Sequence, residues 1–554
     1  MWSASPDRYS RGESPARTGE RASNRERVGS SGIGRNGPLV GLPVKTAGAT
    51  DAAAGSSGGP APAIMIAIGG RKTVPLADRA PAPGRLREAA STMTPKSGPA
   101  TVPESSHSPA PYDGPTREEV LATRRQYLTP GLLTYYREPL LIVEGHMQYL
   151  WDDAGKQYLD GFAGIVTVSV GHCHPKIVEK VRDQVGKLQH ATTIYLHPTA
   201  GEFARKLAEH MPADSGLTVS YFTNSGSEAN EIAVLSSREF TGNSEVISLR
   251  NGYHGGTQGA MGLTAVGTWK FKGNPTVDVK HATPGYCYRC PFGLTYPSCD
   301  LKCARDVRDL IRHETSGEVA CFIGETIQGV GGVVTPPPGY FATIYEIVRE
   351  AGGLCVADEV QTGFGRTGSA FWGFENWGVT PDLVTMAKGI GNGIPLGACV
   401  TRPEVARMMA NRVHFNTFGG NPVSMTQGLA TLEVIDAEGI QANAREVGGH
   451  LKDRLSDLQA RHPLIGEVRG MGLMLGVELV RDRTSKEPAA SETAEILELC
   501  KGRGLLLGKG GLAGNVLRIK PPMCLTRADA DFLVDCLDEA LEIVENRMHG
   551  KTKN

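Results

Sequence analysis

From about residue 116 onward, short apolar runs alternate with amphipathic stretches along the chain. Segments 175–188 and 199–211 space their apolar residues as one face of a helix does. Between such segments lie β-rich runs that each end in a polar group: "SYFTN", "EVISL", "VACFIGE", "GLCVADE" and "DLVTMAK". This alternation predicts an α/β domain over residues 176–423, with a mostly parallel sheet covered by helices.

The pattern changes after about residue 423. Two long helical segments come first, then the strand-like runs "GMGLMLGVELV" and "GNVLRIKPPM", and a closing helical segment "RADADFLVDCLDEALEIVENRM". We expect residues 424–554 to form a separate, smaller α+β domain. Residues 116–175 are expected to contribute to it as an N-terminal segment.

Residues 1–115 differ from the rest in composition. They are rich in Ser, Gly, Pro, Ala and Arg, with almost no aromatic residues and no apolar period. Such a segment cannot bury enough surface to offset its ordering entropy, so we predict a disordered extension. Its Arg and Ser content has a weak similarity to that of an organelle transit peptide, but Asp7, Glu13, Glu20 and Glu26 are unfavourable in such a peptide. A true start at Met93 is a third interpretation.

Charge and cysteine content exclude several classes of protein. With 58 basic and 59 acidic residues the net charge is -1, so a nucleic-acid or anionic-membrane partner is not expected. No apolar run is long enough to span a bilayer. The 11 cysteines, without a signal peptide, favour reduced thiols. We expect a cytoplasmic protein, or a mitochondrial one if the extension is a transit peptide.

The turn after the first of these strands suits a phosphate group. Ser225, Gly226 and Ser227 lie between a strand and a helix that begins near Glu228. Backbone N–H groups and the positive end of the helix dipole meet at such a turn. The alternative is that Ser-Gly-Ser serves only as a helix N-cap.

Two carboxylates follow directly on another strand. Asp358 and Glu359 come after a run apolar enough to be internal. A buried carboxylate needs a cationic partner or a function, and one such function is to pair with a protonated ring nitrogen. The alternative is a carboxylate satisfied by backbone groups or by an arginine.

A single lysine stands in the apolar and glycine-rich run "LVTMAKGIGNGIPLG". Apolar surroundings lower the pKa of a lysine, which makes Lys388 a candidate nucleophile that forms Schiff bases. Taken alone, it could equally be a surface residue at a strand end. Pyridoxal 5'-phosphate, however, needs a phosphate cradle, an acid for its ring nitrogen and an amine for its aldehyde. The three strand-end features together therefore predict this cofactor.

Six motifs extend the argument beyond these three features: "YFTNSGSEANEIA", "RNGYHGGTQGAMGLT", "GETIQGVGGVVTPPPGY", "VADEVQTGFGRTG", "PDLVTMAKGIGNGIPLGA" and "FNTFGGNPVS". In this order they resemble the class III (ornithine/GABA-type) aminotransferases, enzymes of pyridoxal-phosphate fold type I. The similarity runs from about residue 138 to the C-terminal helix.

The resemblance implies a role for each matching cofactor residue. Ser225, Gly226 and Ser227 would hold the phosphate, and Tyr253 would stack on the ring. In the same way, Asp358 would pair with the ring nitrogen, Gln361 would lie near the ring hydroxyl, and Lys388 would carry the cofactor.

Two further residues bear on the partners of the chain. By resemblance, Thr417 would reach the phosphate of a neighbouring subunit, which implies a homodimer or homotetramer with shared active sites. Arg518 matches the arginine that binds the substrate carboxylate, a task that guanidinium geometry suits. The substrates would be a small amino acid and a 2-oxo acid.

Within the class, the chain looks most like the alanine–glyoxylate branch. Val330 stands where ornithine and GABA enzymes have a gating glutamate, and Thr326 stands where a proline is usual. The resemblance implies transfer of an amino group from an alanine-like donor to glyoxylate or pyruvate by a ping-pong mechanism. Alternatives are an omega-amino acid transaminase, acting on β-aminoisobutyrate, β-alanine, GABA or ornithine, or a phospho-lyase acting on phosphorylated amino alcohols. A binding protein of the same fold is a further alternative.

One cysteine cluster lies outside this picture. Cys287, Cys290, Cys299 and Cys303 have the spacing C-x2-C-x8-C-x3-C, and each pair fits tetrahedral zinc. The middle gap is shorter than in common zinc ribbons. Four reduced cysteines in a surface insertion, or a disulfide pair, are the alternatives, so we expect no metal while keeping this possibility open.

Overall fold

The computed structural model describes residues 99–274 and 278–551, all within one compact unit. Most of the predicted extension, residues 1–98, lies outside the described residues.

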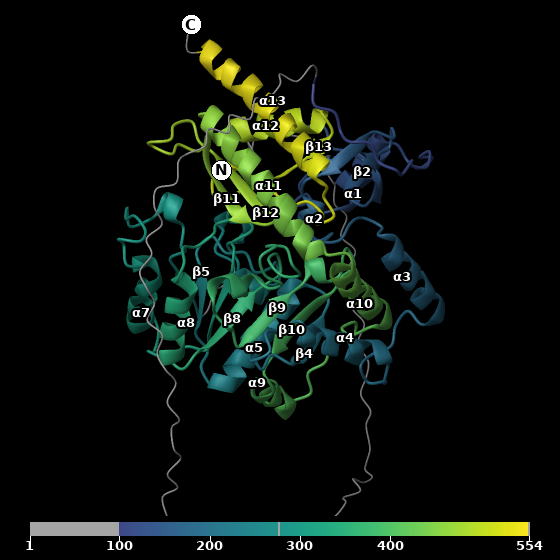
Figure 1. The fold of residues 1–554 in the computed structure, drawn as a ribbon. Helices are drawn as coiled ribbons and strands as arrows, with labels where there is room; N and C mark the ends of the chain where they lie inside the picture. Colours follow the sequence, from purple (N-terminus) through teal and green to yellow (C-terminus); the bar gives the residue numbers. More distant parts are fainter. Residues whose placement is uncertain (1–98, 275–277, 552–554) are drawn as a thin grey trace, which may run out of the picture. The chain divides into compact units, whose positions relative to one another are not determined.

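The centre of the fold is a seven-stranded sheet (Figure 1). From edge to edge its strands are β4 (Val219–Thr223), β10 (Gly397–Thr401), β9 (Leu383–Met386), β8 (Leu354–Asp358), β7 (Cys321–Glu325), β5 (Val246–Leu249) and β6 (Val279–Ala282). All neighbours from β9 to β6 are parallel, and β10 is antiparallel to both of its neighbours. The predicted mostly parallel sheet is confirmed, and all five predicted strand segments belong to it.

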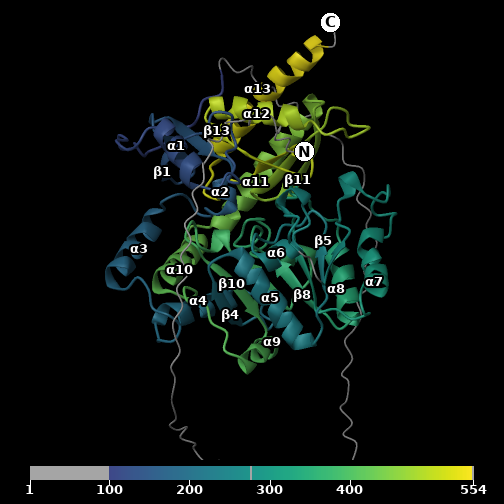
Figure 2. The ribbon, with the colours of Figure 1, turned by 180° about the vertical axis from the view of Figure 1, so that it is seen from behind.

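Alternate residues of each strand face different helices, as the period of two requires. On one face, Ile323 and Val356 pack against α5 (Gly226–Thr241), α6 (Gln258–Leu263) and α9 (Pro403–Met408). On the other face, Phe322 and Cys355 pack against α7 (Lys302–Glu314) and α8 (Tyr340–Glu350). The same face continues over α4 (Pro198–Glu209) and α10 (Pro422–Ala437), as Figures 1 and 2 allow the reader to follow. Both faces of the sheet are thus covered.

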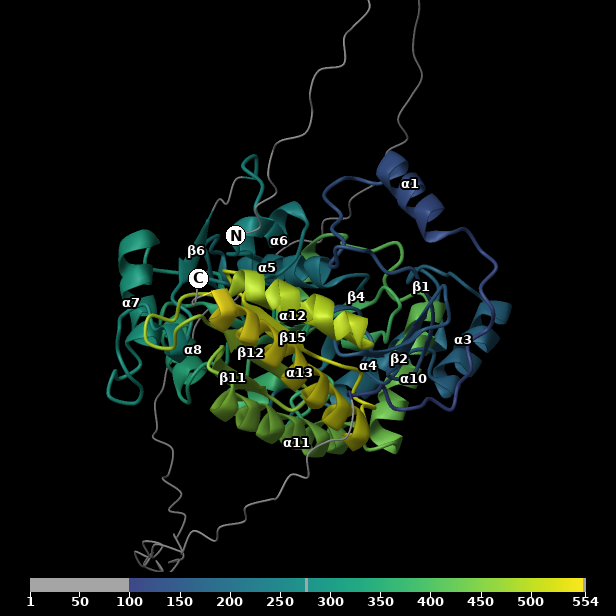
Figure 3. The ribbon, with the colours of Figure 1, turned by 90° about the horizontal axis from the view of Figure 1, so that it is seen from above.

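A second, antiparallel sheet lies in the C-terminal part. Its order is β11 (Ile465–Met471), β12 (Met474–Leu479), β15 (Val516–Ile519) and β14 (Gly508–Gly510). Figure 3 shows it with α11 (Ile440–Arg461), α12 (Ala490–Gly502) and α13 (Arg527–Lys551), of which α13 packs against both other helices. The predicted runs "GMGLMLGVELV" and "GNVLRIKPPM" contain β12 and β15.

The N-terminal segment forms a third sheet, with strands β1 (Ile142–His146), β2 (Tyr149–Asp152), β3 (Gln157–Asp160) and β13 (Leu505–Leu506). The parallel pairing of β3 with β13 joins residues 116–175 to the C-terminal part. This pairing supports the predicted contribution to a small domain, and the domain boundaries stay predictions.

The remaining elements are short or peripheral. They are α1 (Arg117–Tyr127), α2 (Ala163–Val166), α3 (Pro175–Lys187) and the 3-10 helices η1 (Gly267–Trp269), η2 (Cys287–Arg289), η3 (Gly373–Trp377), η4 (Lys388–Ile390) and η5 (Met409–Asn411). None of the helices in the described residues combines the length and apolar character needed to cross a membrane.

Residues 99–115 differ from the prediction of a disordered extension. The backbone N–H of Ala100 donates to Glu539 Oε1 at 2.7 Å, and Gln157 Nε2 donates to the carbonyl of Pro103 at 2.8 Å. His107 stacks on His146 with ring centroids 4.7 Å apart. These contacts hold residues 99–115 against the rest of the fold. The segment has no regular apolar period, so its composition does not predict the contacts.

Candidate active site

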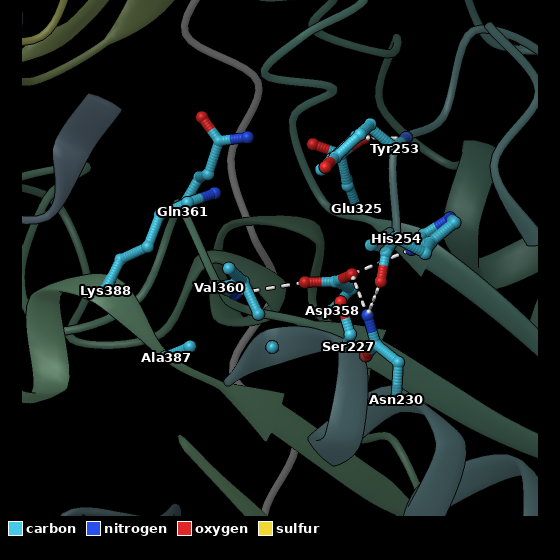
Figure 4. A pocket seen from close by; sticks show the side chains of 12 residues that line it. Ser227, Asn230, Tyr253, His254, Glu325, Asp358, Val360, Gln361, Ala387 and Lys388 are labelled. Carbon is cyan, nitrogen blue, oxygen red and sulfur yellow. Dashed lines mark hydrogen bonds and ion pairs between the residues drawn. The ribbon is translucent and has the colours of Figure 1, made fainter. Parts of the chain in front are cut away.

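A cavity of about 180 Å³ opens where β7, β8 and β9 end. In Figure 4, Lys388 and Gln361 lie on one side and Tyr253 and His254 on the other, with Asp358 between them. The carboxyl ends of parallel strands meet at one edge of a sheet, so residues far apart in the sequence converge here.

The N-terminus of α5 forms one wall. Ser225 is its N-cap: its Oγ accepts from the backbone N–H of Glu228 at 3.2 Å. Gly226 and Ser227 line the cavity, and Ser227 Oγ accepts from the N–H of Gly256 at 3.1 Å. The side chain of Ser225 is thus used by the helix, while the positive end of the helix dipole meets the cavity.

Asp358 is held at three points. Its Oδ2 accepts from Asn230 Nδ2 at 2.9 Å and from His254 Nδ1 at 2.7 Å, and its Oδ1 accepts from the N–H of Val360 at 3.1 Å. The side chain is buried, with 2% of its residue surface exposed. Asn230 is fixed in turn, because its Oδ1 accepts from Thr385 Oγ1 at 2.6 Å.

His254 responds to this carboxylate. Burial alone would lower the pKa of its imidazole, but the hydrogen bond and charge of Asp358 outweigh burial and raise that pKa. The other ring nitrogen, Nε2, is buried and has no hydrogen-bond partner among the described residues. His254 therefore helps to fix the orientation of the Asp358 carboxylate.

Lys388 comes two residues after the end of β9, at the start of η4. Its backbone has a positive φ of 51°, an uncommon conformation for a residue with a side chain. Burial lowers the pKa of its amine, against the opposing charges of Asp358 and Glu325. A lysine in this setting is available as a neutral amine more readily than one at the surface.

Glu325 is a second buried carboxylate in the cavity wall. Its Oε1 and Oε2 accept from the backbone N–H groups of Tyr253 at 2.9 Å and Gly329 at 2.7 Å. Burial raises the pKa of this carboxyl group, and Asp358 adds to the effect. Glu325 also positions Tyr253, whose ring lies edge-on to Trp269 with centroids 5.1 Å apart.

Arg518 lies on β15 and is 5% exposed. Its Nη2 donates to the hydroxyl of Tyr135 at 3.1 Å, and its guanidinium group is 4.9 Å from the ring centroid of Phe162. Both Nε and Nη1 are buried without a partner among the described residues. A buried guanidinium group with free donors is a site prepared for an anion.

Thr417 does not line the cavity of its own chain. It is exposed, in the segment between η5 and α10. Its neighbour Asn416 reaches the turn before α5, where its Oδ1 accepts from Asn224 Nδ2 at 3.0 Å. Of the residues predicted from sequence, Ser225, Thr417 and Arg518 are not among those that line the cavity.

The residue at the usual proline position has a structural role. Thr326 Oγ1 lies 3.1 Å from Glu359 Oε1 and 3.0 Å from Thr362 Oγ1. Glu359 also accepts from the backbone N–H groups of Gly373 and Phe374, at 2.7 and 2.8 Å. Burial raises the pKa of Glu359 to about 7 despite these bonds. Glu359 therefore joins β8 to η3 rather than facing the cavity.

The four cysteines of the C-x2-C-x8-C-x3-C cluster are free thiols. Burial raises the pKa of Cys303 to about 11, and the neighbouring thiols add to this shift. Within residues 99–274 and 278–551, no group of three or more His, Cys, Asp or Glu side chains is arranged to hold a metal ion. The structure gives no support to the zinc alternative.

Several residues of the site were not singled out in the sequence. Asn230 comes four positions after Gly226, so both lie on one face of α5. His254 follows Tyr253 directly. Lys520 comes two positions after Arg518, and the period of a strand puts both on the same side. The positions of Asn230, His254 and Lys520 relative to predicted site residues are thus the sequence features that point to them.

The family follows from comparison with known proteins. The model of the family described as aminotransferase class-III matches residues 134–541. The chain belongs to this family. Class III aminotransferases use pyridoxal phosphate, so the chain is a pyridoxal-phosphate-dependent transaminase of the predicted α/β fold.

The chain is similar to one relative from Arabidopsis thaliana and to two solved structures. It is 51% identical over 442 residues to the "Alanine--glyoxylate aminotransferase 2 homolog 2, mitochondrial" of Arabidopsis thaliana, covering 80% of this chain and 91% of the relative. A phospholyase from Arthrobacter, solved in complex with phosphoethanolamine, has a TM-score of 0.71 and 34% identity, covering 76% of this chain and 99% of its own. An amine transaminase from an uncultivated Pseudomonas species, in its PLP-bound form, has a TM-score of 0.71 and 31% identity, covering 76% and 99% of the two chains.

Proposed function

We propose that the protein transfers the amino group of alanine, or a similar small amino acid, to glyoxylate or pyruvate. The observation that carries the proposal is the convergence of Lys388, Asp358 and the N-terminus of α5 on one cavity, with the unpaired donors of Arg518 nearby. The alanine–glyoxylate name of the Arabidopsis relative supports the choice of substrates.

The cavity fits pyridoxal phosphate at each of its reactive groups. Gly226, Ser227 and the helix dipole of α5 would hold the phosphate. Asp358 would face the ring nitrogen, and Tyr253 would lie on the ring. Gln361 would be near the ring hydroxyl. These residues all line the cavity.

The cofactor, when bound, supplies an electron sink for the bonds at the substrate Cα. Lys388 Nζ is the group of this chain that would hold the cofactor and then move a proton to and from Cα. The lowered pKa of its amine favours the neutral form that a base needs. Asp358, oriented by Asn230 and His254, would keep a proton on the ring nitrogen.

Arg518 would bind the substrate carboxylate through its free Nε and Nη1 donors. A gating glutamate is missing, because position 330 is Val330. The backbone carbonyl of Val330 instead accepts from Gly511 at 3.0 Å, next to the strand of Arg518. No ion pair between Arg518 and a carboxylate is present in the described residues. Without a carboxylate partner in the described residues, Arg518 is free to bind the carboxylate of the substrate. This favours a donor such as alanine, whose carboxylate is bonded to the reacting carbon.

We further propose that two chains complete each other's active sites, with Thr417 reaching the phosphate of a neighbouring subunit. The support is a set of exposed apolar side chains: Val413 and Phe418, in the segment of Thr417, are 98% and 62% exposed. In the segment where Thr193 approaches Gly420, Ile194 and Leu196 are 73% and 104% exposed. Apolar side chains exposed together mark protein interfaces.

A phospho-lyase activity is the second candidate, because the Arthrobacter structure has phosphoethanolamine bound. The experiment that separates the two supplies alanine with glyoxylate in one sample and phosphoethanolamine in another. Aminotransfer predicts pyruvate and glycine from the first sample. Release of inorganic phosphate from the second sample, with no pyruvate from the first, would decide for the phospho-lyase.

The compartment remains a prediction. The name of the Arabidopsis relative says that it is mitochondrial. We retain a cytoplasmic enzyme with a mitochondrial one as the alternative. Fluorescent fusions of the full chain and of a chain without residues 1–98 test this, because only a transit peptide makes organelle import depend on those residues.

A further inference from the structure

Lys520 is a second buried amine near the site, with no part in the chemistry described above. It follows β15, and its residue is 0% exposed. Burial lowers the pKa of this amine well below its ordinary value, and the charge of Arg518 adds to the effect. Burying an ammonium group is costly unless it has partners, so its contacts indicate what it does.

The contact that Lys520 makes points to Gln361. Its Nζ donates to Gln361 Oε1 at 2.8 Å. Gln361 itself lines the cavity. Lys520 itself does not line the cavity, so its bond to Gln361 is its link to the cavity. We therefore expect Lys520 to act on the cavity through Gln361.

The bond determines which end of the amide is free. Lys520 Nζ donates to Oε1, so the Nε2 end of the amide is the donor that this bond leaves free. Gly329 packs against the same amide: a Cβ at position 329 would lie 2.3 Å from both Oε1 and Nε2 of Gln361. The hydrogen bond from Lys520 and the close packing of Gly329 thus both oppose rotation of the Gln361 amide.

We propose that Lys520 is a positioning residue, which holds Gln361 so that its Nε2–H donates to the ionised ring oxygen of the cofactor. The inference rests on the proposed function, since it takes the cavity to bind pyridoxal phosphate. An amide whose carbonyl oxygen accepts a hydrogen bond is polarised, so its Nε2–H stabilises a negative oxygen more than the N–H of an unpaired amide does.

Four charged residues around Lys520 affect its protonation, and all four are left unchanged in the experiment. Glu325 at the end of β7 favours its charged form, while Arg518 on β15, Lys388 on η4 and Arg366 in the turn after β8 oppose it. None of these is changed in the variants below, so a shift can be assigned to the Lys520–Gln361 pair.

The experiment is a double-mutant cycle on holoenzyme, read from the pH midpoint of the bound cofactor's absorption change. Lys520→Met removes the donor to Gln361 Oε1, so Gln361 is no longer held in place and the ring oxygen loses support. We expect the midpoint to rise by about one pH unit, the size typical of a lost charge-assisted hydrogen bond. We also expect cofactor to dissociate several-fold faster from the variant. Lys520→Arg keeps an N–H donor and should shift the midpoint less.

The decisive comparison is made in a Gln361→Ala background, where Lys520→Met should cause no further shift. An equal shift with and without Gln361 would show that Lys520 acts directly, and no shift in either background would show that it does not act at all; both results overturn the inference. Unfolding of the apoproteins is followed as a control, and if Lys520→Met does not fold, Lys520→Gln is used, with a smaller shift of the same sign expected. Failure of the wild-type protein to bind pyridoxal phosphate would instead contradict the proposed function.

Discussion

At the scale of single residues, the site depends on how firmly Asp358 is oriented. Three hydrogen bonds fix its two oxygens, and two of the donors are side chains of residues that are themselves held. Asn230 Oδ1 accepts from Thr385, and the backbone N–H of His254 donates to Thr264 Oγ1 at 3.0 Å. A carboxylate fixed in this way can keep a ring nitrogen protonated without rearranging during the reaction.

Asp358→Asn is expected to lower kcat/KM at least about a hundredfold, because removing one partner of a buried charge pair costs about 3–5 kcal/mol. The variant should still bind cofactor, since Lys388 and the N-terminus of α5 remain. Steady-state kinetics and absorbance of bound cofactor measure the two effects separately. Turnover close to that of the wild type would mean that another group holds the ring nitrogen.

At the scale of elements, hydrogen bonds from loops to helices position the strand ends. Glu359 links β8 to η3 through two backbone N–H groups, and Thr326 joins this link from the end of β7. The threonine thus replaces the usual proline with a side chain that partners a buried carboxyl group.

Thr326→Val is expected to destabilise the protein by about 1–3 kcal/mol, because Glu359 Oε1 stays buried after it loses one of its two donors, the other being the N–H of Phe374. Urea unfolding at constant pH measures the change. Thr335→Val is the control, since the Thr335 hydroxyl bonds only to a carbonyl at 3.3 Å in a half-buried loop. Equal effects at both positions would argue against a special role for Thr326.

A second link joins α11 to α13. His462, at the C-terminal end of α11, lies with Nε2 2.7 Å from Asp538 Oδ1 and Nδ1 2.8 Å from Glu545 Oε2. Burial alone would lower the pKa of His462, but hydrogen bonds to the two carboxylates outweigh it and raise that pKa to about 9. The protonated ring thus stabilises the fold fully below the ordinary histidine pKa, and this contribution is lost as pH rises through about 9.

The free energy of unfolding should therefore fall by roughly 2–3 kcal/mol between about pH 6.5 and 9 because of this residue. His462→Gln should remove that slope, as measured by denaturant unfolding across the range. His313→Gln, at an exposed position of α7, should leave the slope unchanged. A slope that persists in His462→Gln would assign it to other groups.

Much of the fold and part of the site could be predicted from the sequence. The five strand segments and the closing helix were predicted because buried strands are continuous apolar runs and surface helices keep their period. Lys388, Asp358 and Gly226 were found because each ends a strand or starts a helix. His254 and Lys520 stand close to predicted site residues in the sequence, but the sequence does not show their contacts with the distant residues Asp358 and Gln361. Glu325 was not predicted for the same reason, since it bonds to the distant Tyr253. The contacts of residues 99–115 were missed for the same reason.

At the scale of the whole molecule, the central question is whether one chain suffices for a site. Thr417 does not line the cavity of its own chain, and we propose that it reaches the phosphate of another subunit. If sites are shared, a heterodimer of a Lys388→Ala chain and a Thr417→Ala chain contains one site with both native residues.

Co-expression of these two variants with different tags, followed by double affinity purification, isolates the heterodimer. We expect its activity to be about half that of the wild type, because one of two sites is intact. Each variant purified alone should be far less active, and Lys388→Ala should be inactive. A heterodimer no more active than the mean of its parents would show that Thr417 serves its own chain.

The account as a whole is tested most directly by the first half-reaction with alanine alone. Purified holoenzyme mixed with excess alanine and no acceptor should release one pyruvate per active site and then stop, and added glyoxylate should restart the reaction and yield glycine. Lys388→Ala should release none. The value of kcat/KM for alanine should also exceed those for GABA and ornithine with glyoxylate as acceptor. If no pyruvate is released, or if GABA or ornithine leads by about tenfold, equal to about 1.4 kcal/mol of transition-state preference, the proposed function is contradicted.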